Sequence, residues 1–292
     1  MKPKNPTKNE TSFVKTAAQY LEKPSLAVQM TNLIGKPVAA GIAMLPSGAQ
    51  ETIATVSRSA LENALSASIA TIPSGTNGSF DSGVKASYWT DWKHTVLTMA
   101  TGAAGGFFGF AALPIELPLT TGIMLRSIAS IADDFGHDLS SHTTRLDCLS
   151  VFAMGSPSDK DDNLESAYFA SRLAMAEVIQ NAAKWLAQKT SEEIAQAIAE
   201  KSAPALISFI AKIAARFDVV ITEKAMAEAI PGIGAVTGAS INGAFSDHFN
   251  AVARFHFGLR ALEEKHGAEA IRSLYDKFNP SRSIKHNLKR SA

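Results

Sequence analysis

The side chains best suited to chemistry are charged, imidazole or amide groups that lie in or beside two long apolar stretches of the chain. They are Glu116, Arg126, Asn242, Asp247, His248, Arg254, His256 and Arg260. Charges in apolar surroundings are costly unless they are paired, so these groups should find partners. They predict either buried salt bridges that hold helices together or one polar pocket between the two stretches. In such a pocket, His248 or His256 would transfer protons and an arginine would bind an anion.

A metal site is the sharper version of the pocket hypothesis. Asp133 and His137 are four residues apart, as are Asp134 and Asp138, so one helix could supply a ligand pair. The sequence contains neither an HExxH motif nor paired ExxH spacings. We therefore predict no metal ligands and no cofactor.

Two glycine-containing motifs resemble a nucleotide-binding loop and a nucleophile elbow, but neither follows the predicted strand that such motifs require. Gly232, Gly234 and Gly238 follow a helical pattern instead of a strand, and their spacing differs from that of a dinucleotide-binding loop. Gly238 to Asn242 lacks the last glycine of the G-x-S-x-G elbow. Cys148 lies between apolar neighbours, which predicts a buried structural thiol.

Helices must position these residues. Apolar side chains recur at helical spacing through most of the chain, whereas strand-like alternation is scarce. The clearest such stripe comprises Ile241, Phe245, His248, Val252, Phe255, Leu259 and Leu262. Pro204 and Pro231 should lie at helix boundaries. The predicted fold is all-α, a single helical-bundle-like domain with two glycine-rich apolar segments packed centrally.

Composition and the chain ends exclude several protein classes. The 292 residues contain 28 Lys and Arg against 27 Asp and Glu, so no basic field points to nucleic acid. A single cysteine excludes an intramolecular disulfide framework. The amino-terminal residues contain no apolar run of the kind found in secretory signals. We therefore expect a cytoplasmic protein. We predict a disordered lead over residues 1–12, a helical domain over 36–280 and a basic tail over 281–292.

The first apolar segment, residues 95–125, contains one charge, Glu116. It is long enough to cross a bilayer, but Pro114 and Pro118 should break a single spanning helix. The remaining alternatives are a buried hairpin of a soluble protein and a hairpin that dips into one leaflet. The second segment, residues 229–246, is uncharged and glycine-rich. We expect the two segments to pack against each other.

Three blocks of sequence carry a family resemblance. They are Leu117–Ala129, Arg145–Gly155 and Ile230–Gly267, and they resemble the EcsC protein family in the same order. The resemblance implies a bacterial helical protein that is cytoplasmic or membrane-associated. The family is named from a gene beside ATP-binding-cassette transporter genes linked to protein secretion. It supplies no catalytic residues to transfer to this chain.

The resulting hypothesis is a non-catalytic accessory protein, peripheral or partly embedded at the inner face of the cell membrane. Its expected partner is membrane lipid or a membrane protein, such as an ABC transporter. Frames of small residues, such as Gly102 with Gly106 and Gly105 with Gly109, also suggest self-association. The alternatives are an enzyme, such as a metal-dependent hydrolase, and a helical bundle that binds an apolar ligand or lipid.

Overall fold

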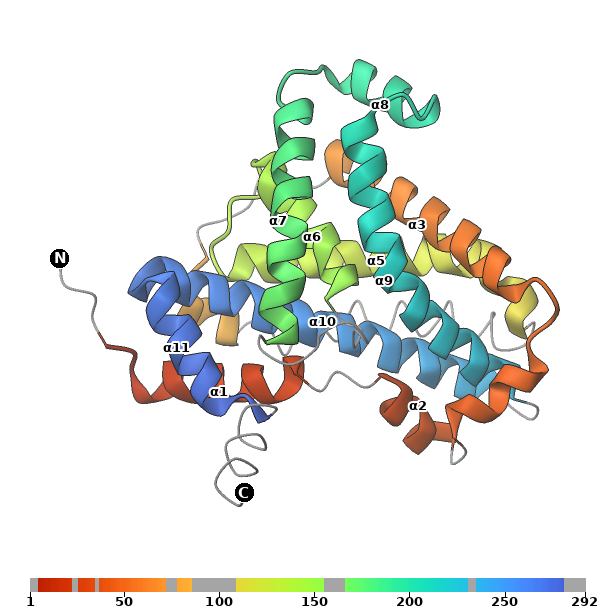
Figure 1. The fold of residues 1–292 in the computed structure, drawn as a ribbon, viewed down its shortest axis with the longest axis horizontal. Helices are drawn as coiled ribbons and strands as arrows, with labels where there is room; N and C mark the ends of the chain where they lie inside the picture. Colours follow the sequence, from red (N-terminus) through yellow and green to blue (C-terminus); the bar gives the residue numbers. More distant parts are fainter. Residues whose placement is uncertain are drawn as a thin grey trace, which may run out of the picture.

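The computed structural model describes residues 5–22, 26–34, 37–71, 78–85, 109–154, 166–230 and 235–280. Every element in these ranges is helical, which confirms the all-α prediction (Figure 1). The α-helices are α1 (Lys8–Leu21), α2 (Leu26–Ile34), α3 (Ala49–Thr71), α5 (Leu113–Asp134), α6 (His142–Ser150), α7 (Ala167–Leu186), α8 (Ser191–Ala199), α9 (Pro204–Ala229), α10 (Ala235–His266) and α11 (Ala268–Phe278). Short 3-10 helices are η1 (Val38–Met44), η2 (Gly109–Ala112) and η3 (Val151–Ala153).

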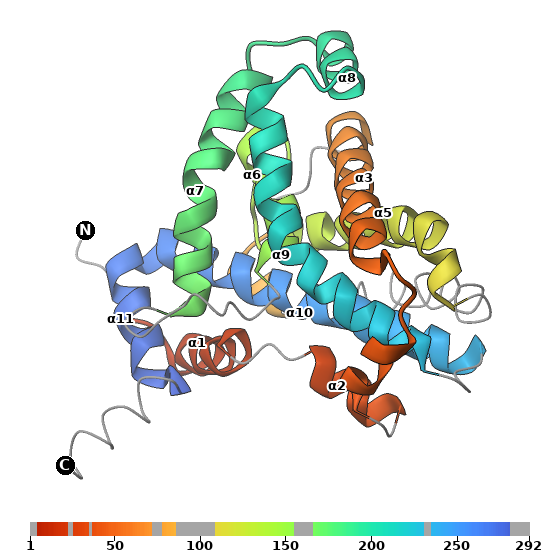
Figure 2. The same ribbon diagram turned by 45° about the vertical axis from the view of Figure 1, so that its right-hand side comes forward.

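Helix α10 is the longest element, with 32 residues, and it runs across the molecule. Its apolar stripe is buried, with Ile241, Phe245, Val252 and Leu259 fully inaccessible to solvent. Helices α1 and α11 pack at its carboxyl end and α2 packs nearer its amino end (Figure 1). Figure 2 shows α7, α9 and α3 rising on one side of α10, with α1 and α2 on the other.

Helix α5 packs along α10 in parallel orientation. Near the start of α5, Glu116 contacts Asn242. Just beyond its end, the Nε2 of His137 lies 2.9 Å from the carbonyl oxygen of Phe257. The described parts of the two apolar segments therefore pack together as expected. Residues 95–108 and 231–234 of these segments lie outside the described residues.

Prolines end or begin helices at three expected places but not at a fourth. Pro204 is the first residue of α9, and α9 ends at Ala229, before Pro231. Pro114 lies in the first turn of α5, where backbone N–H groups have no partner in the helix. Pro118 lies inside α5 without ending it, so the predicted break there is wrong. A proline at this position removes one backbone hydrogen bond near the start of the helix.

The amino-terminal region differs from the predicted lead and domain boundary. Helix α1 begins at Lys8, because Thr7 and Glu10 form a capping box in which each side chain binds the other's backbone N–H. Helices α1 and α2 pack against α10. Residues 8–12 are therefore helical, and residue 36 follows packed structure. The predicted basic tail, residues 281–292, lies outside the described residues.

Candidate functional site

The predicted site residues do not form one pocket, because helix α10 separates them. Asn242 joins Glu116 near the amino end of α10, whereas His256 and Arg260 join Asp147 near its carboxyl end. Asn242 and His256 are 14 residues apart, which corresponds to about 21 Å along the helix axis. The structure thus contains two polar clusters, and each has partners that the sequence did not reveal.

The first cluster, which we call the lysine cluster, comprises Glu116, Lys224, Glu228 and Asn242. The Nζ of Lys224 lies 2.7 Å from Oε1 of Glu116 and 2.5 Å from Oε1 of Glu228. Asn242 donates from Nδ2 to Oε1 of Glu116 at 2.8 Å. Lys224 is fully buried, and its Nζ lies 5.9 Å from the centre of the Phe245 ring. This cluster therefore joins α5, α9 and α10 in the interior.

The lysine cluster contains two carboxyl groups for one ammonium group. Burial opposes the charge of Lys224, but Glu228 and Glu116 outweigh burial and raise the pKa of Lys224. Burial raises the pKa of Glu228, and the attraction of Lys224 only partly offsets it. Oε2 of Glu116 has no hydrogen-bond partner among the described residues. The cluster thus favours the charged form of Lys224 and the protonated form of Glu228 more than water would.

Lys224 and Glu228 were missed by the sequence analysis. A signal was available, because Phe217, Val220, Ile221 and Lys224 follow one another at helical spacing on the buried side of α9. A lysine within such a stripe must be paired or must lower its pKa. Its partner on α5 is 108 residues away and leaves no local pattern.

The second cluster, which we call the arginine cluster, comprises Asp147, Tyr168, Arg172, His256, Arg260 and Glu263. Oδ2 of Asp147 accepts from Arg260 and lies 3.1 Å from Nε2 of His256. The hydroxyl of Tyr168 lies 3.0 Å from Nδ1 of His256. Arg172 donates two parallel bonds of 2.8 Å to Glu263 and a longer one of 3.4 Å to Tyr168.

Protonation in the arginine cluster follows from burial and charge. Burial lowers the pKa of His256, which favours a neutral ring. A neutral His256 donates from Nε2 to Asp147 and accepts the Tyr168 proton at Nδ1, which satisfies both contacts. Burial alone would raise the pKa of Asp147, but His256 and Arg260 bring it well below its ordinary value. Asp147 therefore remains ionised and orients both partners.

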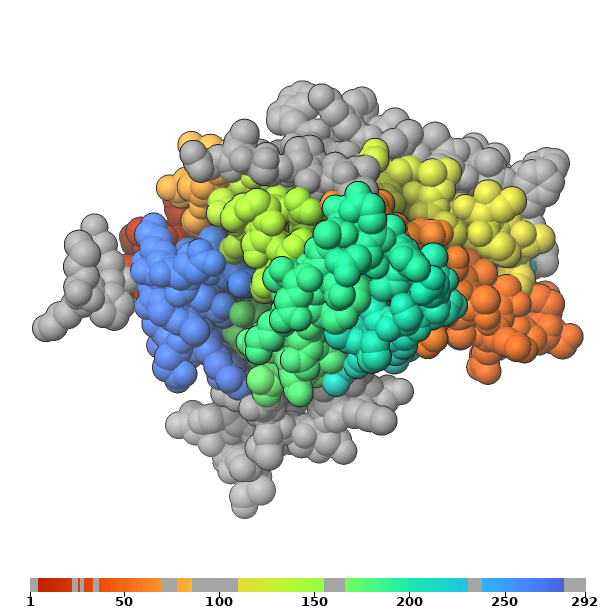
Figure 3. All heavy atoms as spheres, turned by 90° about the horizontal axis from the view of Figure 1, so that it is seen from above, coloured from red at the N-terminus to blue at the C-terminus, as the bar shows by residue number. Residues whose placement is uncertain are grey.

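The arginine cluster forms one wall of a pocket of about 420 Å³. This pocket lies between α6, α7 and the junction of α10 with α11, where Figure 3 shows a hollow between the blue and green surfaces. Asp147, Arg172, Arg260 and Glu263 line it, whereas Tyr168 and His256 lie behind the wall. Apolar side chains also line the pocket, namely Met154, Phe169, Leu173, Met175, Ala176 and Ile179. Tyr168 and His256 therefore contact the pocket only through the residues that line it.

The remaining predicted residues lie elsewhere. Arg126 is exposed on α5, Asp247 is exposed on α10 and Arg254 is partly exposed there. His248 is buried, with Nδ1 3.3 Å from the hydroxyl of Tyr20 on α1. The four contribute to neither polar cluster as defined above.

The carboxylate and histidine pairs do not share a helix face. Helix α5 ends at Asp134, and Gly136, with φ 89°, turns the chain before His137 and Asp138. The predicted ligand pairs with Asp133 and Asp134 are therefore wrong. Within the described ranges, no group of three or more His, Cys, Asp or Glu side chains could hold a metal ion. Cys148 is buried, as predicted.

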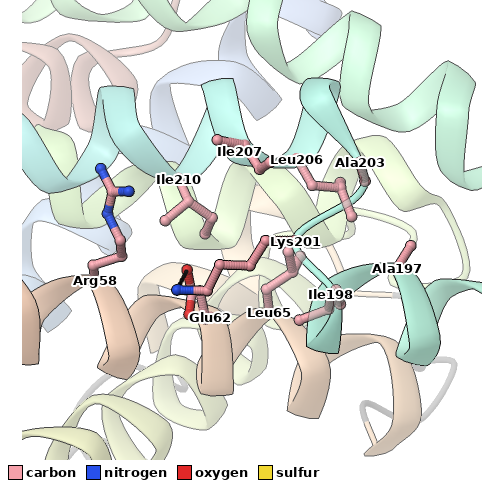
Figure 4. A pocket seen from close by; sticks show the side chains of 10 residues that line it. All are labelled: Arg58, Glu62, Leu65, Ala197, Ile198, Lys201, Ala203, Leu206, Ile207 and Ile210. Carbon is pink, nitrogen blue, oxygen red and sulfur yellow. Dashed lines mark ion pairs between the residues drawn. The ribbon is translucent and has the colours of Figure 1, made fainter.

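A second depression lies between α3, α8 and α9 (Figure 4). Lys201 and Glu62 face each other across it, with 3.8 Å between Nζ and Oε1, and apolar side chains such as Leu206 and Ile210 form the floor. Its volume of about 30 Å³ is that of a single water molecule. It is therefore too small to be a ligand site.

Several apolar side chains are exposed on η1 and at the start of α5. We call these residues the apolar end: Ile42 and Met44 of η1, and Ile115 and Leu119 of α5. Ile115 is 81% exposed and Leu119 is 54% exposed. In the described part of the chain, one helical span, Phe110–Asp134, is long and apolar enough to cross a membrane. Most of its apolar window is buried, as in the core helix of a soluble protein.

Comparison with known proteins gives one informative result. No curated protein and no solved structure matches the chain. The model of the EcsC protein family matches residues 14–262, which include the lysine cluster, the arginine cluster except Glu263, and the exposed start of α5. Because this match covers most of the 292 residues, the chain belongs to the EcsC protein family.

Proposed function

We propose that this EcsC protein is a non-catalytic accessory protein that docks on the inner face of the cell membrane through its apolar end. Its immediate partner is membrane lipid, and the docked protein would serve a membrane protein such as a transporter. The observation that carries this proposal is the exposure of Ile115 and Leu119, which lie one turn apart on the same face of α5.

The exposed face of α5 changes from apolar to basic over a short distance. Arg126 lies on the same face as Ile115 and Leu119, seven residues beyond Leu119, or about 10 Å along the helix. Interfacial helices bury their apolar side chains about 5–10 Å into the headgroup region. Arg126 would then lie beside the inserted apolar side chains, where it can contact the lipid phosphates.

The sequence before α5 extends this apolar character. Residues 95–115 contain no charged side chain. An anchor of this length supports insertion deeper than two side chains would achieve alone. The basic tail, with Arg282, Lys285, Lys289 and Arg290, adds attraction to anionic headgroups.

The polar clusters support a role without catalysis. The lysine cluster is buried, and its charges already contact one another. In the arginine cluster, the groups suited to proton transfer, Tyr168 and His256, do not line the pocket. The lysine cluster therefore supports a structural role, and the arginine cluster supports a role in binding.

Vesicle co-sedimentation tests the proposal. We expect the wild-type protein to sediment with vesicles that contain phosphatidylglycerol. The double variant Ile115→Ser with Leu119→Ser should bind at least ~10-fold more weakly, because two exposed apolar side chains are lost. Val219→Ser is the matched control, since Val219 is an exposed apolar residue (43%) on α9. Arg126→Gln should weaken binding to anionic vesicles only.

Two results would contradict lipid docking. One is a wild-type protein that ignores anionic vesicles, and the other is a double variant that binds as the wild type does. Binding to native bacterial membranes without binding to lipid vesicles would replace lipid by a membrane protein as the partner. Sedimentation equilibrium without vesicles would reveal self-association through the same face.

A further inference from the structure

The pocket beside the arginine cluster is separate from the apolar end. It lies beside the carboxyl end of α10, whereas α5 begins near the amino end of α10 (Figure 1). Its volume of about 420 Å³ is within the range of small-molecule pockets. The lining combines charged and apolar side chains, so it indicates what kind of ligand would fit.

Arg260 retains hydrogen-bond donors at the surface of the pocket. Its side chain lines the pocket and is 32% exposed. Among the described residues, Arg260 donates one hydrogen bond, to Asp147. A guanidinium group has five N–H donors, so Arg260 can bind a carboxylate or a phosphate while it keeps its contact with Asp147.

Arg260 is held in place before any ligand arrives. Asp147 is buried, and its Oδ2 accepts hydrogen bonds from Arg260 and from the neutral His256. Its Oδ1 accepts from the hydroxyl of Ser150 at 3.1 Å. A guanidinium group held in this way loses little conformational entropy on binding. Asp147 and His256 are therefore positioning residues, since they act through Arg260.

The other charges of the pocket limit the ligand to one anionic group. Arg172 is matched by Glu263 in a bidentate pair. Arg272 and Glu269 also line the pocket, with the guanidinium carbon of Arg272 5.4 Å from the centre of the Phe169 ring. Three arginines thus face three carboxylates, and the pocket has no net charge to attract a polyanion.

Most of the apolar lining comes from α7. Phe169, Leu173 and Ala176 lie at helical spacing along one face of this helix, and the side chains of Arg172 and Gln180 lie among them and line the pocket too. Leu173 is 71% exposed, which is costly for a leucine without a partner. A ligand with a hydrocarbon body would cover this apolar lining.

We propose that this pocket binds an amphipathic anion, with its carboxylate or phosphate on Arg260 and its apolar body against α7. This inference goes beyond membrane docking and does not depend on it. A free fatty acid and the phosphate of a lipid share this chemistry, and the choice of probes distinguishes them.

Isothermal titration calorimetry on the full chain tests the inference. The four probes are decanoate, decyl phosphate, decanol and inorganic phosphate, and the three probes with a decyl chain are kept below the concentrations at which they aggregate. We expect decanoate or decyl phosphate to bind at least ~10-fold more tightly than decanol and inorganic phosphate, because a charged hydrogen bond and apolar burial act together. Preference for decanoate would indicate a free acid, and preference for decyl phosphate would indicate a lipid phosphate. Binding of decanol with equal affinity would overturn the anion site.

Arg260→Gln should weaken binding of the preferred probe by about 10- to 100-fold. Arg126→Gln is the matched control, because Arg126 is an exposed arginine far from the pocket. If Arg260→Gln fails to fold, Ala176→Trp provides a second test, since Ala176 is exposed and a tryptophan there fills the pocket without removing a buried contact.

Wild-type protein that binds neither anionic probe, or a folded variant that binds as the wild type does, would overturn the proposal. Ile115→Ser with Leu119→Ser should leave probe binding unchanged, which separates this inference from membrane docking.

Discussion

The two ends of helix α10 use similar residues for different purposes. Near the amino end, Asn242 contacts a lysine cluster that is buried and has one cation for two carboxyl groups. Near the carboxyl end, Arg260 belongs to a cluster in which each arginine has its own carboxylate and one side reaches a pocket. Depth of burial makes the difference: a buried cluster stabilises the contact between helices, whereas a cluster at a pocket wall also offers donors to a ligand.

The largest expected effect comes from removing the buried cation. Lys224→Met would leave Glu116 and Glu228 without their cation in the interior, and we expect a loss of about 3–5 kcal/mol in the free energy of unfolding. Urea denaturation measures this loss. Lys212→Met, the same substitution at an exposed position of α9, should change stability by less than about 0.5 kcal/mol. Similar losses in the two variants would show that the lysine cluster carries no special stability.

An intermediate effect is expected for the acid of the arginine cluster. Asp147→Asn would remove the charge that holds Arg260 and His256, and we expect a loss of about 2–3 kcal/mol. The loss is smaller than for Lys224 because Arg260 is partly exposed and can be solvated. Asp81→Asn, at an exposed position, serves as the control for urea denaturation. A loss larger than that of Lys224→Met would reverse the contrast between the two ends.

The smallest effect is a pH dependence of opposite sign at the two ends. The folded state raises the pKa of Glu228 above its ordinary 4.5, so folding takes up a proton and this stabilisation is lost as the pH rises through the raised pKa. The folded state lowers the pKa of Asp147 below its ordinary 3.8, so its stabilisation is present above that pH and is lost as the pH falls.

Urea denaturation across a pH series separates these two contributions. Glu228→Gln should flatten the stability profile above about pH 4.5, and Asp147→Asn should flatten it below about pH 3.8. Each variant should leave the other window as it is in the wild type. Slopes of the same sign in both windows would refute the contrast in protonation.

Much of the fold could be predicted because the relevant signals are local. The stripe from Ile241 to Leu262 predicted the buried face of α10, and Pro204 and Pro231 predicted the boundaries of α9. The capping box of Thr7 and Glu10 is a local signal for the start of α1, which begins within the predicted disordered lead. Pro118 shows the opposite case, since a residue that usually breaks helices lies inside α5 without ending it.

The candidate site was less predictable because its contacts join distant parts of the chain. The sequence indicated that Glu116, Asn242, His256 and Arg260 needed partners, since charges and amides in apolar surroundings are costly. It could not indicate which partners, because 108 residues separate Lys224 from Glu116 and 113 separate Asp147 from Arg260. The sequence by itself determined the helices and the family, through periodicity, caps and motif order. Only the tertiary structure decided that one cluster is buried while the other lines a pocket, because burial depends on how the helices pack.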